Sequence, residues 1–141
     1  MTRIVPLDRY NWELVLNIQL SPEQEQFLPS VLYSLAQARF EQLHPFGILS
    51  DEEMVGLLMY GQFGGICWIN RIMIDKDHQR KGIGSAAVEA LLRDLRFSRK
   101  CGEVRTSFAK NNYPAEQFFH QLGFQNLPDG PSDETVAVYN P

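Results

Sequence analysis

The run MIDKDHQRKGIGSAAVEALL, residues 73–92, constrains the fold of this chain more than any other stretch. It passes from apolar residues to a charged loop, then to Gly82-Ile83-Gly84, then to a helical pattern. The first turn of a helix has backbone N–H groups without intrahelical partners, and glycines let a ligand approach such a backbone closely. A strand, a polar loop, glycines and a helix in this order indicate an anion site, most often for phosphate. Arg80 and Lys81 add positive charge beside it.

Hydrophobic periodicity around this run predicts a mixed α/β domain with a parallel crossover through a helix over 83–97. Further helices are expected over 11–20, within 31–43 and over 111–123, and a short one is expected to start at Ser21. Strands are expected over 2–7, 45–50, 54–61, 65–75, 103–108, 124–127 and 134–140, with a turn at 128–131. The predicted apolar helix faces are Trp12, Val15, Leu16 and Leu20; Leu32, Leu35, Ala36 and Phe40; Ile83, Ala87, Ala90, Leu91 and Leu95; and Ala115, Phe118, Phe119 and Leu122. A single domain, 1–141, is expected at this length.

The charge of the chain is segregated although the net charge is only −4. Residues 1–66 hold eight acids and three bases, whereas residues 76–100 hold seven bases and three acids. This pattern favours an anionic ligand near residue 80 and a cationic one elsewhere. A sequence pI of about 5.3 argues against a nucleic-acid partner.

Composition bounds the cellular setting. The two cysteines, Cys67 and Cys101, form neither a disulfide framework nor a zinc pattern. No apolar run approaches the ~20 residues of a membrane span, and the N-terminal residues lack the apolar region of a secretory signal. We therefore expect a cytoplasmic protein with no membrane partner.

Two phosphate-binding patterns compete for the glycine run. Residues 82–87 match the dinucleotide pattern G-x-G-x-x-A, but seven residues separate the strand from the glycines, and Glu103 begins the next strand where a ribose-binding acid would end it. Gln79 to Gly84 instead match Q/R-x-x-G-x-G/A, the acyl-CoA pyrophosphate loop of the GNAT superfamily of N-acetyltransferases. A second signature of that superfamily, N-x-x-A-x-x-x-Y/F-x-x-x-G-F, is matched by Asn112, Ala115, Phe119, Gly123 and Phe124.

The chain thus resembles the GNAT superfamily over essentially its whole length. Within it, the chain is most similar to the bacterial spermine/spermidine acetyltransferase group, through SLAQA (34–38), PFGIL (45–49), VGLLMYG (55–61), WINRIMID (68–75) and the pair Asn111-Asn112. The resemblance implies a mixed, mostly antiparallel sheet of six to seven strands with a central splayed parallel pair and about four helices. It also implies acetyl-CoA as co-substrate, without a metal.

The resemblance implies a set of cofactor-binding residues. Backbone at Ile72, Met73 and Ile74 would pair with the pantetheine arm, the loop would wrap the pyrophosphate, and Asn112 and Phe119 would lie near the thiol. The full set is Ile72, Met73, Ile74, Gln79, Arg80, Lys81, Gly82, Ile83, Gly84, Ser85, Asn112 and Phe119.

The catalytic acid and base are not identified. Phe119 stands where the family usually has a tyrosine acid, and Asn70 where polyamine-acetylating members tend to have a carboxylate; neither side chain transfers protons usefully. Tyr113 is a weak substitute, and Tyr60, His44 and His78 remain as groups acting through water. In this superfamily the first two helices shape the acceptor site, so Glu23, Glu25 and Glu41 are candidate amine ligands.

Three functions stay open at this point. The first is an acetyl-CoA-dependent N-acetyltransferase that acts on a primary amine of a small molecule, with a polyamine as one candidate. The second is an acyl-CoA-binding module with lost or regulatory activity, suggested by Phe119 and Asn70. The third is acetylation of protein or peptide amines. A homodimer is also open, with residues 134–140 able to extend a neighbour's sheet.

Overall fold

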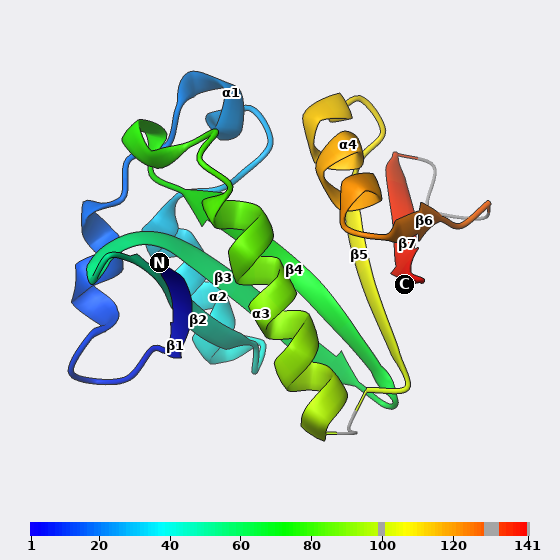
Figure 1. Cartoon of the computed structure of the whole chain (residues 1–141), viewed down its shortest axis with the longest axis horizontal. Helices are drawn as coiled ribbons and strands as arrows, with labels where there is room; N and C mark the ends of the chain where they lie inside the picture. Colours follow the sequence, from blue (N-terminus) through cyan, green and yellow to red (C-terminus); the bar gives the residue numbers. More distant parts are fainter. Residues whose placement is uncertain (99–100, 129–132, 141) are drawn as a thin grey trace.

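The structure, a computed structural model, describes residues 1–98, 101–128 and 133–140 (Figure 1). In chain order the elements are β1 (Thr2–Pro6), the 3-10 helix η1 (Trp12–Asn17), α1 (Pro22–Glu25), α2 (Val31–Phe40), β2 (His44–Ser50), β3 (Glu53–Phe63), β4 (Ile66–Ile74), the 3-10 helix η2 (Lys76–His78), α3 (Ile83–Ser98), β5 (Glu103–Ala109), α4 (Tyr113–Gln121), β6 (Phe124–Asn126) and β7 (Glu134–Tyr139). The bases Arg99 and Lys100 lie outside the described residues, and so does the predicted turn at 128–131 apart from its first residue.

One seven-stranded sheet, in the order β1-β2-β3-β4-β5-β7-β6, organises the molecule. Every neighbouring pair is antiparallel except β4 and β5, which are parallel. The α3 helix makes the crossover between these two strands. The predicted fold class, a mostly antiparallel sheet with one central parallel pair, is therefore confirmed.

Two hydrophobic clusters pack on opposite faces of the sheet. The α3 face is built from Ala87, Val88, Leu91 and Leu92 against strand residues such as Leu58 and Ile69. On the other face, η1 and α2 pack through Val15, Val31 and Ala38 against Leu57, Met59 and Met73. In Figure 1, α3 lies in front of the sheet and α2 behind it.

Local signals fix the helix starts. The hydroxyl of Ser21 accepts from the backbone N–H of Gln24, whose side chain in turn accepts from Ser21 N–H, so the predicted capping box is present at α1. The side chain of Asn112 caps α4 by accepting from the N–H of Ala115 at 3.3 Å. Gly123 follows α4 with φ +102°, a conformation that favours glycine.

The apolar faces predicted for the first two helical stretches are wrong. Residues 11–20 form only the 3-10 helix η1, in which Val15 is buried and Leu16 is 42% exposed. In α2 the buried residues are Val31, Ser34 and Ala38, whereas Leu32 is 62% and Phe40 is 85% exposed. Apolar residues lie on both the buried and the exposed side of α2, so its periodicity cannot choose the face that meets the sheet.

Cys67 and Cys101 form a disulfide, with 5.5 Å between their Cα atoms. The cysteine count predicted no disulfide framework, and this single bridge corrects that expectation. Cys67 is fully buried on β4, and Cys101 lies just before β5. The bridge therefore joins the two parallel strands at the end where they pair.

The C-terminal strand is not a free edge. β7 lies between β5 and β6, and the edge of the sheet on this side is the three-residue β6. The idea that residues 134–140 extend a neighbour's sheet therefore loses its basis. Among the described residues, none of the helices is both long and apolar enough to cross a membrane.

Candidate active site

The two parallel strands part halfway along their length. β4 and β5 pair only from Ile66 with Glu103 to Ile69 with Thr106, although both strands continue further. At the last pair, the hydroxyl of Thr106 donates to the carbonyl oxygen of Ile69 at 3.0 Å, and it is buried there. Beyond this point, no strand among the described residues pairs with the backbone edge of β4 that faces β5.

A β-bulge lies at the same place. On the other side of β4, Tyr60 pairs with Ile69 and Met59 with Arg71, so that Asn70 is the extra residue. A bulge bends its strand and increases the local twist. It therefore helps to turn the end of β4 away from β5.

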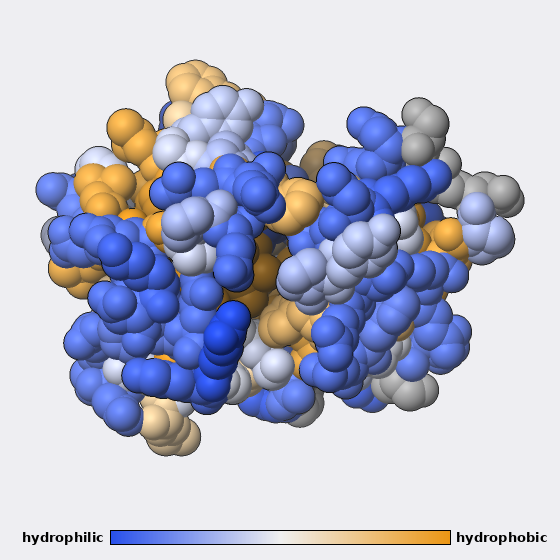
Figure 2. All heavy atoms as spheres, turned by 90° about the horizontal axis from the view of Figure 1, so that it is seen from above, coloured by the Kyte–Doolittle hydropathy of each residue, from blue (hydrophilic) through white to orange (hydrophobic). Residues whose placement is uncertain are grey.

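A cleft of about 670 Å³ occupies the gap between the separated strands. Its walls come from α1 and the residues after it, the end of β4, the loop before α3, and α4; the lining residues are Ser21, Glu23, Gln24, Gln26, Phe27, Leu28, Ile72, Ile74, Gln79, Arg80, Gly84, Phe108, Asn111, Asn112, Pro114, Ala115, Phe118 and Phe119. Figure 2, the view from above, shows apolar atoms at the floor of the hollow between largely hydrophilic flanks. The site is thus an apolar slot with a polar mouth.

The loop from Asp75 to Lys81 is held in place by its own polar contacts. The Asp75 carboxylate accepts from the N–H of Gln19 at 2.9 Å and of Asp77 at 3.1 Å, and it lies 3.1 Å from His78 Nδ1. His78 Nε2 lies 3.1 Å from a carboxylate oxygen of Glu53. His78 therefore bridges the loop to the start of β3 and is not among the residues that line the cleft.

The electrostatics of Asp75 follow from these contacts. Partial burial disfavours its charged form, but the hydrogen bonds from Gln19, His78 and Asp77 outweigh that effect. The pKa of Asp75 consequently lies below its ordinary value, and the carboxylate stays ionised at neutral pH.

The glycines differ in their roles. Arg80 and Gly82 have φ of +62° and +77°, and a side chain at Gly82 would meet open space, so the turn requires a left-handed backbone there. At Gly84 a Cβ would lie 3.3 Å from Cε1 of Phe118 and 3.8 Å from Cδ1 of Ile72. Gly84 thus lets α3 approach the cleft wall closely, and the first obstacle to a side chain is the Phe118 ring.

The N-terminus of α3 faces the mouth of the cleft. Its first helical hydrogen bond runs from the N–H of Ala86 to the carbonyl of Gly82, at 3.1 Å. The preceding N–H groups have no intrahelical acceptor, as at any helix start, and carry a partial positive charge. Arg80 adds a full charge to the same wall.

These features fit a coenzyme A moiety. An extended pantetheine arm can pair with an unpartnered strand edge as an added strand does, and the free edge of β4 after Ile69 offers such pairing. A pyrophosphate suits the helix N-terminus and the glycine turn. The described residues contain no group of three or more His, Cys, Asp or Glu placed to hold a metal ion.

The predicted cofactor residues divide into three groups in the structure. Ile72, Ile74, Gln79, Arg80, Gly84, Asn112 and Phe119 line the cleft. Met73 and Ile83 bury their side chains in the two cores, so only their backbones remain available. Lys81, Gly82 and Ser85 belong to the loop and the first turn of α3 without lining the cleft.

The proton-transfer candidates are dispersed. Phe119 is buried among the rings of Phe108, Phe118 and Phe124. Asn70 is exposed at the bulge, and Tyr113 is 68% exposed on an outer surface of α4, where it lines a separate hollow. None of the catalytic candidates except Phe119 lines the cleft.

The two remaining alternatives lie on β2 and β3. Tyr60 stacks on His44, with 4.8 Å between ring centroids, and on Phe46. Burial, and to a lesser degree Asp94, raises the pKa of Tyr60, so its hydroxyl stays protonated at neutral pH. Neither ring is among those that line the cleft.

The three candidate carboxylates are also separated. Glu23 lines the cleft, whereas Glu25 is exposed outside it and Glu41 caps the C-terminal end of α2. Near Glu41, the guanidinium of Arg71 donates to the hydroxyl of Ser34 at 3.0 Å and to Gln37 Oε1 at 2.7 Å. Burial lowers the pKa of Arg71 while Tyr33 and Glu41 raise it.

Sequence reasoning missed part of the cleft wall. Gln24 and Phe27 come from α1 and the residues after it, and Gln24 Oε1 accepts a hydrogen bond from Gln79 Nε2. No spacing signal links two residues so far apart in the chain. Phe108, in contrast, follows Val104 and Thr106 on one face of β5, and this alternation indicates its direction.

Comparisons with known proteins agree with this geometry. The model of the acetyltransferase (GNAT) family matches residues 12–124. A probable spermine N(1)-acetyltransferase of Bacillus subtilis subsp. natto (strain BEST195) is 30% identical over 124 residues, covering 82% of each chain. Relatives at this level share the fold and the general chemistry of the family.

Solved structures show the same fold at low identity. The PaiA N-acetyltransferase from Thermoplasma acidophilum, in complex with coenzyme A, superposes with a TM-score of 0.74 at 12% identity, covering 99% of both chains. The ribosomal-protein-S18-alanine N-acetyltransferase from Escherichia coli superposes with a TM-score of 0.75 at 21% identity, covering 99% of this chain and 93% of that one.

Proposed function

Because this chain belongs to the GNAT family of acetyltransferases, we propose that it acetylates a primary amine of a small molecule, with a polyamine as the leading candidate acceptor. The chain is an N-acetyltransferase that uses acetyl-CoA. The nature of the acceptor, the residues that bind each substrate and the route of the proton are the proposed parts.

The observation that carries the proposal is the early end of the β4–β5 ladder. Pairing stops at Ile69 and Thr106, and the free edge of β4 borders a cleft that ends at the N-terminus of α3. One extended thioester fits this path, with its phosphates at the α3 end. Acetyl-CoA supplies the activated acetyl group when it is bound.

The chain's own residues would bind and orient this co-substrate. Backbone groups from Ile72 to Ile74 would pair with the extended arm, and backbone N–H groups from Arg80 to Ser85 would surround the phosphates. Asn112 and Phe119 would form the wall near the reacting end, where the aromatic cluster excludes water. The Asn112 side chain is already engaged in capping α4, which fixes its position.

The acceptor must lose a proton before it reacts. An alkylamine resembles lysine, with a pKa of about 10.4, so its neutral form at pH 7 costs about 4–5 kcal/mol. Glu23 is the one carboxylate among the described residues that line the cleft. We assign to it the binding of the incoming ammonium group and, directly or through water, the acceptance of its proton.

A thiolate of ordinary pKa leaves without strong acid assistance. Phe119 in the family's tyrosine position is then compatible with turnover, because the leaving group does not depend on a tyrosine hydroxyl.

The polyamine proposal rests on two observations. The curated relative of Bacillus subtilis is described as a probable spermine acetyltransferase, and the cleft mouth carries Glu23 on the α1 side. A polyamine is a multiply charged cation, and a carboxylate at the mouth of the cleft favours a cationic acceptor of this kind.

A thiol-release assay with acetyl-CoA tests the proposal. The acceptor panel contains spermidine, spermine, a monoamine, an amino sugar and a peptide with an N-terminal alanine. We expect turnover with the polyamines and a lower kcat/KM with the monoamine. Turnover with the peptide alone would favour a protein acetyltransferase, and acetyl-CoA binding without turnover on any acceptor would favour a binding module.

The location of the protein belongs to the proposal as well. A cytoplasmic site of action fits acetyl-CoA as co-substrate. The Cys67–Cys101 disulfide provides a test of this location, because disulfides are rare in reducing compartments such as the cytoplasm. Thiol labelling of protein isolated without reductant shows whether the two cysteines are reduced or joined in the disulfide.

A further inference from the structure

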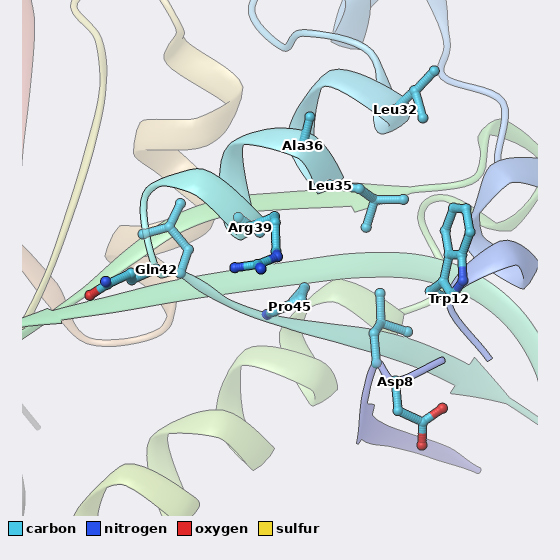
Figure 3. A pocket seen from close by; sticks show the side chains of 11 residues that line it. Asp8, Trp12, Leu32, Leu35, Ala36, Arg39, Gln42 and Pro45 are labelled. Atoms are coloured by element: carbon cyan, nitrogen blue, oxygen red, sulfur yellow. The ribbon is translucent and has the colours of Figure 1, made fainter. Parts of the chain in front are cut away.

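The solvent-exposed face of α2 is as apolar as the interior of a protein. Helices that cover a sheet normally present polar residues to solvent. On α2, Leu32 is 62%, Tyr33 is 59% and Phe40 is 85% exposed, and Ala36 between them is exposed as well. This face points away from the sheet, as Figure 3 shows for Leu32 and Ala36.

A groove runs beside this face. It has a volume of about 660 Å³ and lies between α2, η1 and the start of β2 (Figure 3). Its lining is largely apolar and consists of Leu7, Asp8, Trp12, Leu32, Leu35, Ala36, Ala38, Arg39, Gln42, Leu43 and Pro45. The groove and the exposed face together form one continuous surface, which we call the α2 surface.

We propose that the α2 surface is the interface of a homodimer, in which the α2 helices of two copies cross in antiparallel fashion at Ala36. The argument rests on self-complementarity. In an isologous contact each residue meets the residue related to it by the two-fold axis.

The order of residues on α2 satisfies this requirement about Ala36. With Ala36 on the axis, Leu32, four residues before it, faces Phe40, four residues after it, in the second copy. Tyr33 likewise faces Arg39. Each of these pairings occurs twice, and all five side chains lie on the exposed part of the helix.

The chemistry of each pairing is favourable. The small side chain of Ala36 lets the helix axes approach, and Leu32, Ala36 and Phe40 form an i, i+4, i+8 ridge of the kind that packs between helices. Arg39 has no ion-pair partner within the described part of the chain, and a guanidinium over the ring of Tyr33 gains a cation–π contact. Phe40 of the second copy meets Leu32 at the rim of the groove, where it can enter the apolar lining.

The exposed apolar area of the α2 surface is that of a small interface. A buried aromatic side chain contributes about 150–250 Å². The exposed fractions of Leu32, Tyr33, Phe40 and Trp12 therefore amount to about 500 Å² of apolar surface per copy. Polar neighbours such as Gln42 extend this toward the roughly 800 Å² per partner of a standard interface.

Sedimentation equilibrium of the full chain over a range of concentrations tests the proposal. We expect the mass of a dimer for the wild type and of a monomer for Ala36→Glu, which places two carboxylates face to face at the axis. Glutamate is a good helix former at an exposed position, so the variant should fold; circular dichroism checks this. The matched control, Gln117→Glu, adds the same charge to the exposed surface of α4 and should remain dimeric.

Cysteine cross-linking locates the axis. A residue on a two-fold axis meets the same residue of the second copy. Ala36→Cys should therefore give a disulfide-linked dimer on oxidation with diamide, which accepts the two electrons and two protons that the two thiols release. Glu89→Cys, exposed on α3, should not. A monomeric wild type, a dimer that persists in Ala36→Glu, or equal cross-linking of both cysteine variants would overturn the proposal.

Discussion

The side-chain amide of Gln79 donates a hydrogen bond to the backbone carbonyl of Ile74, with 3.1 Å between Nε2 and O. The same nitrogen also donates to Gln24 on α1. One side chain thus joins the loop before α3, the last residue of β4 and the opposite wall of the cleft. Loop, strand and α1 are held together at the mouth of the site.

Loss of this junction should loosen the loop. We expect Gln79→Ala to weaken acetyl-CoA binding about five- to ten-fold, since one neutral hydrogen bond contributes about 1 kcal/mol and the loop must then be ordered on binding. Isothermal titration calorimetry measures the change. Gln121→Ala, exposed at the end of α4, is the control, and equal affinities of the two variants would contradict a role of the loop in binding.

The two loop glycines should respond differently to substitution. Gly84→Val should reduce acetyl-CoA affinity at least ten-fold, because its side chain meets the Phe118 ring and narrows the cleft beside the helix N-terminus. Gly82→Ala meets open space but must adopt φ +77°, so it should mainly destabilise the loop, by about 1–2 kcal/mol. Titration with acetyl-CoA and urea unfolding separate these effects.

The control for both glycine variants is Gly65→Ala, in the turn between β3 and β4, where an added Cβ meets nothing within 4 Å. It should leave the affinity for acetyl-CoA unchanged. Wild-type affinity of Gly84→Val would show that the phosphates bind elsewhere.

Glu23 should act on the acceptor and not on the donor. Glu23→Gln is expected to raise KM for a polyamine about ten-fold, to lower kcat because the amide cannot accept the proton of the amine, and to leave the dissociation constant of acetyl-CoA within a factor of two. Glu25→Gln changes an exposed carboxylate outside the cleft and serves as the matched control. If both variants behave alike, Glu23 contributes only through the net charge of the chain.

The Asp75 carboxylate should make the fold sensitive to acid. Its pKa is lowered in the folded chain, so its contribution is fully present above the ordinary value near pH 4 and is lost as the pH falls through the lower folded value. We expect the free energy of unfolding to fall below about pH 4, and to fall less in Asp75→Asn, which is less stable at pH 7. Urea titrations between pH 3 and pH 7 provide the test; parallel pH profiles would argue against it.

Reduction of the disulfide should destabilise the chain. Cys67 and Cys101 are 34 positions apart, and closing a loop of that length stabilises a protein by about 2–4 kcal/mol. Unfolding with and without dithiothreitol measures the difference. The double variant Cys67→Ala and Cys101→Ala should be insensitive to the reductant, and a wild type equally insensitive would show that the bridge does not contribute.

Much of the fold was predictable because its signals are local. The capping box at Ser21, the Asn112 cap and the glycine after α4 each act over a few residues, and the structure contains all three. Apolar runs beside the acidic turn at 51–53 predicted the central strands correctly. The predicted buried face of α2 was wrong because apolar residues lie on both its buried and its exposed side, so no local signal selects the face that meets the sheet.

The sequence by itself determined the order of elements and the family, because cap residues, apolar strand runs and the two signature spacings are properties of short stretches. The tertiary structure decided which distant residues meet. Only the folded chain ends the β4–β5 ladder at Thr106, brings Gln24 to Gln79, joins Cys67 to Cys101 and leaves Leu32, Ala36 and Phe40 outside. These contacts join residues far apart in the chain, and their geometry depends on how the sheet bends and twists, which no local pattern encodes.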